Sequence, residues 1–444
     1  MSCARPEVGV VFFPAFDWAI SPSHPEREER LLYTKDQIFE EGILDLPQFR
    51  EYRPRVARVE EVERAHVCIP DVHSVASEPH FISAGGAMAA ADAFMRGEVR
   101  RAAALVRPPG HHAMRIVHGA RGFCNINNEA IMVEHLRQSF GRELRIAFVD
   151  TDAHHADGTQ DIYYNDPDVL HISIHQDGRT LYPGTGFPEE LGGPGAYGLT
   201  LNVPLPPLTG DEGLLLAIER LVVPVLEDFQ PDVLINSAGQ DNHYSDPITN
   251  MMVSAQGYAT LTDRLRPDIL VLQGGYSIEG ALPYVNVGIL LAMAGLDYSS
   301  VREPDYDPVR LRQSPAINPY VEHLCARLLE VWRRRREVDL GRVFGTEEYF
   351  TRRRTIYYDT DGITEYQDER IRLCGVCSGY RAIKTTAHHE DGRIVKAFVV
   401  LVPRKACREC AARSTKEVEA ASRRSDHGFV YLQDMSKDRL VRYR

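Results

Sequence analysis

In the stretch Arg145-Ile146-Ala147-Phe148-Val149-Asp150-Thr151-Asp152-Ala153-His154-His155-Ala156-Asp157-Gly158, an apolar run leads directly into three carboxylates and two imidazoles. Residues 145–149 are rich in strand formers and predict a buried strand of an α/β sheet. Because side chains alternate along a strand, Asp150, Asp152 and His154 project in the same direction. Open α/β sheets place their sites at the carboxyl ends of strands, so the stretch is a candidate metal site. A polar loop with helix-capping aspartates is the alternative interpretation.

Short apolar strands alternate with helices on both sides of this stretch. Strands are expected at 8–13, 101–106, 145–149, 169–174, 199–203, 233–237 and 269–273. Helices are expected at about 26–41, 81–97, 127–140, 158–164, 211–228, 254–265, 282–295 and 318–336. This order predicts an α/β fold with a mainly parallel sheet flanked by helices on both faces.

The chain of 444 residues exceeds one typical domain, and its composition changes near Gly345. We therefore expect a large catalytic domain at residues 1–345 and a small domain at residues 346–444. Residues 331–444 carry 25 Lys and Arg against 17 Asp and Glu, a net charge of +8. Since the net charge of the whole chain is −12, residues 1–330 carry −20. No run approaches the roughly 18 apolar residues of a membrane span, so a cytoplasmic protein without a membrane partner is expected.

Three more segments follow expected strands and carry similar chemistry. In Pro108-Pro109-Gly110-His111-His112, prolines and glycine fix a sharp turn that presents adjacent imidazoles, although such histidines are commonly solvated loop residues. Asp241 can join Asp152 and His154 as a third ligand and leave an open position, as a catalytic metal site requires. A glycine turn at Gly274-Gly275-Tyr276 can aim a tyrosine hydroxyl at the same place.

Taken in order, six motifs resemble those of the zinc-dependent histone deacetylase family, which includes bacterial deacetylases and acetylpolyamine amidohydrolases. They are Arg107–Ala113, Gly122-Phe123-Cys124-Asn125, Val149–Gly158, Tyr182-Pro183-Gly184-Thr185-Gly186, Ala238–Pro247 and Gly274-Gly275-Tyr276. Each motif is weak alone, but their shared order over residues 8–330 is specific. The resemblance implies an arginase/deacetylase-like fold and a metal-dependent amidohydrolase. Its expected substrate is an acetyl or other short acyl group on the ε-amine of lysine or on a similar primary amine.

The resemblance also implies a role for each site residue. The implied zinc ligands are Asp152, His154 and Asp241, and the implied catalytic residues are His111, His112, Asp150, Asp157 and Tyr276. In this interpretation the histidines are a general base and a general acid, with Asp150 behind His111 and Asp157 behind His112. Tyr276 would donate its hydroxyl to the oxyanion. Two carboxylates with one imidazole also accept Fe²⁺, so the metal is a prediction.

Further expectations concern a second cation and the substrate. Asp150 and Ser173, partly through backbone oxygens, match the family's inner monovalent-cation site, usually K⁺. The implied substrate-binding residues are Gly122, Phe123, Tyr182, Ile248 and Gly274, with Phe123 and Tyr182 as aromatic walls around an aliphatic stem. Ile248 stands where polyamine-selective relatives carry a glutamate, which argues against polyamines, whereas the negative charge of residues 1–330 favours cationic substrates.

Near the C-terminus, Cys374-Gly375-Val376-Cys377 is followed by Cys407-Arg408-Glu409-Cys410. Paired CxxC motifs predict a structural zinc site, here in a zinc-ribbon-like domain with strands at 381–386 and 394–402. Redox-active or merely buried cysteines are the alternatives. The scattered Cys3, Cys68, Cys124 and Cys325 are expected to be free thiols. The basic run Arg352-Arg353-Arg354 faces either nucleic acid or another acidic partner, or else the acidic catalytic domain.

Other functions compete with lysine deacylation. Within enzymes they are deacylation of acetylpolyamines or other small molecules, including an acetoin-utilisation type, and an arginase-like hydrolase with two manganese ions. A binding module for acyl-lysine or nucleic acid is the non-enzymatic alternative. The chain retains Tyr276 and both histidines of the pair, which favours an enzyme.

Overall fold

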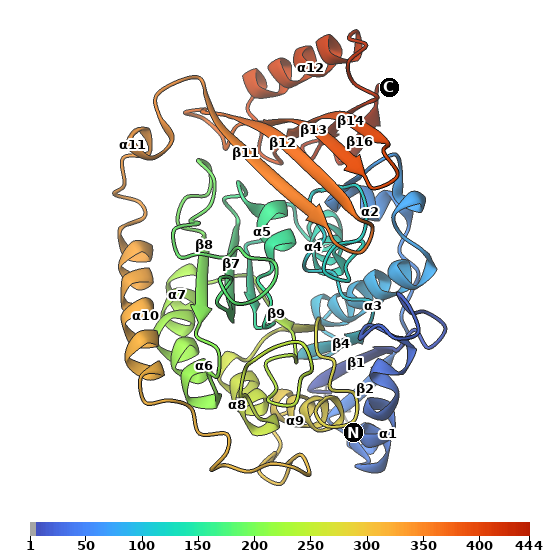
Figure 1. The fold of residues 1–444 in the computed structure, drawn as a ribbon, viewed down its shortest axis with the longest axis vertical. Helices are drawn as coiled ribbons and strands as arrows, with labels where there is room; N and C mark the ends of the chain where they lie inside the picture. Colours follow the sequence, from blue (N-terminus) through green and yellow to red (C-terminus); the bar gives the residue numbers. More distant parts are fainter. Residues whose placement is uncertain (1–5) are drawn as a thin grey trace.

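The structure is a computed structural model that describes residues 6–444, and Cys3 lies outside the described residues. An eight-stranded sheet forms its centre, and all neighbouring strands in it run parallel (Figure 1). In sheet order the strands are β2 (Phe49–Tyr52), β1 (Val8–Phe13), β4 (Arg101–Val106), β10 (Ile269–Leu272), β9 (Val233–Ala238), β6 (Ile146–Asp150), β7 (Val169–Gln176) and β8 (Thr200–Leu205). The predicted parallel α/β sheet is confirmed, and the edge strand β2 is an addition to it.

Helices cover both faces of this sheet (Figure 1). Alternation along β4 sends Ala103 and Leu105 into one apolar core and Ala104 and Val106 into the other. The first core packs against α1 (Leu32–Glu40), α6 (Asp211–Ala217), α7 (Val223–Phe229), α8 (Ala255–Leu265), α9 (Leu282–Met293) and α10 (Ile317–Arg334). The second packs against α2 (Val59–Ala65), α3 (Glu78–Met95), α4 (Asn128–Ser139) and part of α5 (Asp157–Tyr163). Within residues 6–444, no helix is long and apolar enough to cross a bilayer.

Some local expectations were wrong. The helix expected at 211–228 is not one α-helix, because a π-helical segment, η4 (Ile218–Val222), separates α6 from α7. Pro224, in the first turn of α7, has no N–H for the α-helical ladder. Short elements went unpredicted because they are too short to show a hydrophobic period. They are α2, the 3₁₀ turns η2 (Ile43–Asp45) and η3 (Val72–Ser74), and the paired strands β3 (Val67–Cys68) and β5 (Ile116–Val117). The expected helix at 26–41 begins as the 3₁₀ turn η1 (Glu28–Leu31) before α1.

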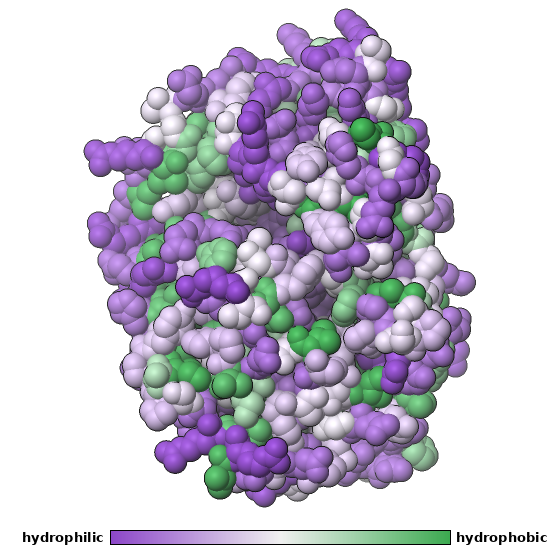
Figure 2. Space-filling view, in the orientation of Figure 1, coloured by the Kyte–Doolittle hydropathy of each residue, from purple (hydrophilic) through white to green (hydrophobic). Residues whose placement is uncertain are grey.

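The C-terminal residues form a second sheet after the short helix α11 (Leu340–Phe344). In sheet order its strands are β11 (Tyr349–Tyr358), β12 (Ile363–Arg372), β13 (Arg381–His389), β14 (Ile394–Val402), β15 (Phe429–Asp434) and β16 (Arg439–Arg442). The strands expected at 381–386 and 394–402 are therefore β13 and β14, in a sheet larger than a two-stranded ribbon. Helix α12 (Arg408–Ser422) packs on one face with an apolar core of its own, and Figure 2 shows a mainly hydrophilic surface over this part.

The other face of the second sheet packs on the part of the chain that forms the large sheet. Ile383, Val399 and Leu401 share an apolar cluster with Val67 and Ile116. Three arginines surround the buried Asp161 of α5, because Arg354, Arg381 and Arg352 place guanidinium nitrogens 2.7, 3.3 and 3.7 Å from its Oδ1. Arg353, with a side chain that is 91% exposed, pairs with Asp368 of its own sheet. Two residues of the basic run, Arg352 and Arg354, thus face Asp161 in the acidic part of the chain.

Candidate active site

Four neighbouring strands of the large sheet, β4, β10, β9 and β6, end at one place. Residues 107–113 follow β4, residues 273–276 follow β10, residues 239–242 follow β9, and residues 151–157 follow β6. Because parallel strands all present their carboxyl ends at the same edge, segments far apart in the sequence meet there. The motifs singled out in the sequence therefore form one site.

Asp152, His154 and Asp241 each offer a ligand atom, and these atoms lie within 4.8 Å of one another. Nδ1 of His154 is 3.1 Å from Oδ1 of Asp152 and 2.9 Å from Oδ2 of Asp241. Burial lowers the pKa of His154, but its hydrogen bonds to Asp152 and Asp241 outweigh burial and raise that pKa to about 10. The two buried carboxylates thus favour a positive charge at the point where the three side chains meet.

Backbone groups hold these carboxylates in place. The N–H of Gly274 donates to Oδ2 of Asp152 at 2.7 Å, and the N–H of Ala153 donates to Oδ1 of Asp241 at 2.7 Å. A Cβ on Gly274 would lie 2.3 Å from Oδ2 of Asp241, and one on Gly239 would lie 2.2 Å from Oδ2 of Asp152. Both glycines are required by this close approach. Gly274 was expected to bind substrate, but its backbone N–H donates to the carboxylate of Asp152.

The adjacent histidines each have a carboxylate behind them. Nδ1 of His111 donates to Asp150 at 3.1 Å, and Nδ1 of His112 donates to Asp157 at 2.8 Å. Burial lowers the pKa of His111, but the charges of Asp152 and Asp150 raise it to about 9. The pKa of His112 lies well below its ordinary value because of burial and the neighbouring positive charges, His111 first. The two imidazoles therefore differ in protonation although both have a carboxylate partner.

Three residues that the sequence did not single out support this pair. Oε1 of Gln273 accepts from the N–H of His111 at 3.1 Å, and Nη1 of Arg121 lies 2.5 Å from Oδ2 of Asp157. Burial and the charge of Asp150 raise the pKa of Glu129 to about 8. Arg121 directly precedes the motif that begins at Gly122, and Gln273 directly precedes the one that begins at Gly274. Their positions next to these motifs are the sequence signal that could have identified them. Glu129 had none, because a glutamate in a helix is ordinarily exposed.

Aromatic side chains surround the site. The ring of Phe123 meets Tyr276 edge to face at 5.4 Å, and the ring of Tyr182 meets His112 at 5.2 Å. Burial raises the pKa of Tyr276 well above 10, so its hydroxyl remains a donor. Gly122 and Phe123 have φ of +52° and +67°, and a Cβ on Gly122 would lie 2.3 Å from Cδ2 of His112. This left-handed turn brings the Phe123 ring against Tyr276.

A buried ion cluster lies behind Tyr276. Glu26 pairs with Arg30 at 2.9 Å and with Arg107 at 2.7 Å, and all three side chains are fully buried. Nε of Arg30 donates to the carbonyl of Gly275 at 2.7 Å, and its guanidinium lies 5.0 Å from the centre of the Tyr276 ring. The cluster fixes the glycine turn. The sequence indicated only a charged helix here, because burial of paired charges leaves no local pattern.

The remaining expected residues lie nearby. Ser173 and Asp150 are register partners on β7 and β6, and Oγ of Ser173 is 2.9 Å from Nδ1 of His175. Oδ1 of Asp150 accepts from the N–H of Asp152 at 3.0 Å. Ile248 lies in the loop after Asp246, where its N–H donates to that carboxylate at 3.0 Å.

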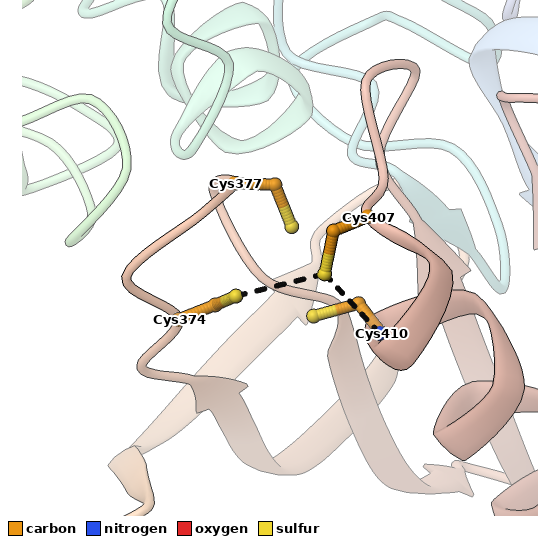
Figure 3. Close-up of side chains that lie close together, drawn as sticks. All are labelled: Cys374, Cys377, Cys407 and Cys410. Atoms are coloured by element: carbon orange, nitrogen blue, oxygen red, sulfur yellow. Dashed lines mark hydrogen bonds between the residues drawn. The ribbon is translucent and has the colours of Figure 1, made fainter.

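The four C-terminal cysteines converge from a loop and from the start of a helix (Figure 3). Cys374 and Cys377 follow β12, whereas Cys407 and Cys410 lie at the start of α12, and their sulfurs are within 4.8 Å of one another. Sγ of Cys374 is 3.8 Å from Sγ of Cys407. That spacing suits tetrahedral zinc, since bonds of about 2.3 Å place ligand sulfurs about 3.8 Å apart. Cys68, Cys124 and Cys325 are buried free thiols, as expected.

Comparison with known proteins gives one consistent result. A model of the histone deacetylase domain matches residues 68–286. A probable deacetylase of Archaeoglobus fulgidus is 46% identical over 64% of this chain and 85% of its own length. The acetoin utilization protein AcuC of Bacillus subtilis is 29% identical over 70% of this chain and 88% of its own.

A solved structure agrees with these relatives. The crystal structure of the HDA15 HD domain superposes with a TM-score of 0.63 at 26% identity, over 74% of this chain and 96% of that one. The second sheet accounts for much of the chain beyond the matched domain. By its fold, its strand-end site and its close archaeal relative, this chain belongs to the histone deacetylase family of hydrolytic deacetylases.

Proposed function

We propose that this enzyme removes an acetyl or other short acyl group from the ε-amine of lysine or from a similar primary amine. The observation that carries the proposal is the convergence of four strand-end segments, which surround one point with Asp152, His154, Asp241, the histidine pair and Tyr276. A binding module would not need two histidines with separate carboxylate partners.

The donor set fits a divalent cation. Two buried carboxylates and one imidazole favour positive charge where they meet, and backbone N–H groups fix both carboxylates. Asp152, His154 and Asp241 would hold zinc, and Fe²⁺ suits the same ligands. When bound, such a cation lowers the pKa of a water and polarises a carbonyl oxygen. Beside it we place a monovalent cation, K⁺, at Asp150 and Ser173, on the strength of their adjacency in β6 and β7.

The protein groups then have separate tasks. Nε2 of His112 accepts a proton from the nucleophilic water, while Asp157 holds the ring by its other nitrogen. His111, held by Asp150, donates a proton to the leaving amine. The Tyr276 hydroxyl donates to the carbonyl oxygen as negative charge develops on it. Phe123 and Tyr182, here called the aromatic walls, would enclose the aliphatic stem of the acylated amine.

A second substrate class is favoured by one observation. The similarity to AcuC extends over 70% of this chain, so deacylation of a small molecule is the alternative within the same chemistry. An aliphatic residue at Ile248 weighs against acetylpolyamines.

A substrate screen tests the proposal. Purified enzyme reconstituted with Zn²⁺ or Fe²⁺ is assayed on acetyl-lysine peptides, on acetylated polyamines and on other short acyl-lysines. We expect release of the acyl group from acyl-lysine peptides and loss of that activity in Asp241→Asn. An enzyme that is metal-loaded and folded yet hydrolyses none of these amides would refute the proposal.

A further inference from the structure

The turn between β11 and β12 (residues 359–362), here called the acidic turn, reaches the catalytic part from the second sheet (Figure 1). Oδ1 of Asp359 accepts from the N–H of Gly122 at 2.9 Å and from the hydroxyl of Tyr182 at 3.0 Å. Oδ2 of Asp361 accepts from the N–H of Ala120 at 2.6 Å. The acidic turn is thus bonded to both segments that carry the aromatic walls.

The hairpin that carries the acidic turn is firmly packed. Ile356, Tyr358 and Ile363 are buried in a cluster with Met114, a residue of the catalytic part. The hydroxyl oxygen of Tyr358 lies 3.0 Å from the carbonyl oxygen of Ile116 and 2.8 Å from Oε2 of Glu365. These contacts lie on both strands next to the turn, so Asp359 has a defined place beside the aromatic walls.

Asp359 is exposed and retains one carboxylate oxygen for a ligand. Within residues 6–444 both of its hydrogen bonds use Oδ1, and Oδ2 accepts from no side chain or backbone group. The nearby cation, Arg121, is buried beneath the Tyr182 ring at 5.3 Å and is engaged with Asp157. His24 meets Phe123 edge to face at 4.3 Å, and burial lowers its pKa although the charges of Glu26 and Asp359 oppose this. The charges that the acidic turn adds beside the walls are both negative.

We propose that Asp359 is a specificity-determining residue, which favours substrates with a positive charge close to the acylated amine. This inference rests on the proposed function, because the aromatic walls would place the stem of the substrate within reach of the turn. The free oxygen would attract either a basic residue next to acyl-lysine or the second amine of an acylated diamine. The second sheet would in this way contribute to substrate choice.

Pairs of substrates that differ in one positive charge measure the effect of that charge on hydrolysis. One pair of acetyl-lysine peptides differs only in an arginine or a citrulline beside the acetyl-lysine, and the other pair is N-acetylputrescine and N-butylacetamide. At low salt we expect kcat/KM to favour the cationic member of at least one pair by about 5-fold, the effect of two unit charges about 4 Å apart in water. The pair that shows the preference identifies the source of the charge, and added salt should reduce the preference.

Variants assign the preference to one residue. Asp359→Asn keeps an oxygen for Gly122 and Tyr182 but removes the charge, so the two members of the pair should be hydrolysed with equal kcat/KM. Asp359→Glu restores the charge and should restore the preference. Asp368→Asn, an exposed acid on β12 that pairs with Arg353, is the control and should leave the preference unchanged.

Two failures are distinguishable. Hydrolysis with equal kcat/KM within both pairs, or a preference that persists in Asp359→Asn, overturns the role of Asp359 and leaves the proposed function intact. No hydrolysis of any acylated amine by the metal-loaded wild type overturns the proposed function and this inference together.

Discussion

Nη1 of Arg354, on β11 of the second sheet, lies 2.7 Å from Oδ1 of Asp161, on helix α5 of the catalytic part. Asp161 is four residues after Asp157, the partner of His112, so the ion pair joins the second sheet to the helix that begins with a site residue. Oδ2 of Asp161 also accepts from the N–H of Arg115 at 3.0 Å. Both oxygens are used, and the arginines hold the pKa of Asp161 below its usual range although burial raises it.

Asp161→Asn should destabilise the protein strongly. The change leaves Arg352, Arg354 and Arg381 close together with one carboxylate fewer, and breaking a buried ion pair costs about 3–5 kcal/mol. Urea unfolding at neutral pH measures the loss. Asp368→Asn removes an ion pair of the exposed Arg353 and should change the free energy of unfolding little. Equal effects of the two substitutions would contradict a structural role for the Asp161 cluster.

Glu369, a buried residue on β12, should make this junction sensitive to acid. Burial raises its pKa, but the nearby guanidiniums, that of Arg352 first, outweigh burial and lower it to about 2. Since the pKa is about 4.3 in an unfolded chain, the stabilisation is complete above that pH and is lost as the pH falls toward 2. The stability difference between wild type and Glu369→Gln, measured by urea unfolding, should therefore be large at pH 6 and shrink below pH 4. A difference independent of pH would contradict this account.

The geometry around Asp152, His154 and Asp241 could be predicted because it depends on local patterns. Each residue comes directly after an apolar strand, and parallel strands bring their carboxyl ends to one edge without further information. The glycine turn before Tyr276 is equally local. For these residues, the period of the strands and the parallel topology are sufficient to predict that they lie together.

Asp359 and Glu26 could not be predicted in this way. Asp359 reaches Tyr182 across 177 residues of sequence, and the contact exists only because the second sheet docks through Ile383, Val399 and Leu401. From the sequence, Glu26 is expected to be an exposed charge on a helix, whereas in the structure it is buried between Arg30 and Arg107. Burial of a charge depends on its distant partners, which hydrophobic periodicity does not reveal.

Metal analysis should give about two zinc ions per chain in the zinc-loaded protein, one for each ligand set. Cys374→Ser together with Cys407→Ser should reduce the content to about one and lower the midpoint of thermal unfolding, because structural zinc contributes folding free energy. Asp241→Asn should also reduce it to about one but should abolish activity. Zinc content that is unchanged by the cysteine substitutions would refute the structural zinc site.

Tyr276→Phe should lower kcat by on the order of 10²-fold or more, as loss of an oxyanion donor does in other enzymes. The ring stays against Phe123, and the fixed turn behind it keeps the hydrogen bonds of Arg30 to backbone carbonyls, so KM should change much less than kcat. Tyr380→Phe is a matched control, since it removes a tyrosine hydroxyl that contacts Tyr349 and Glu417 in the second sheet. That control should retain wild-type kcat and lose some stability. If Tyr276→Phe kept full turnover on an acetyl-lysine peptide, the hydroxyl would have no part in stabilising the oxyanion.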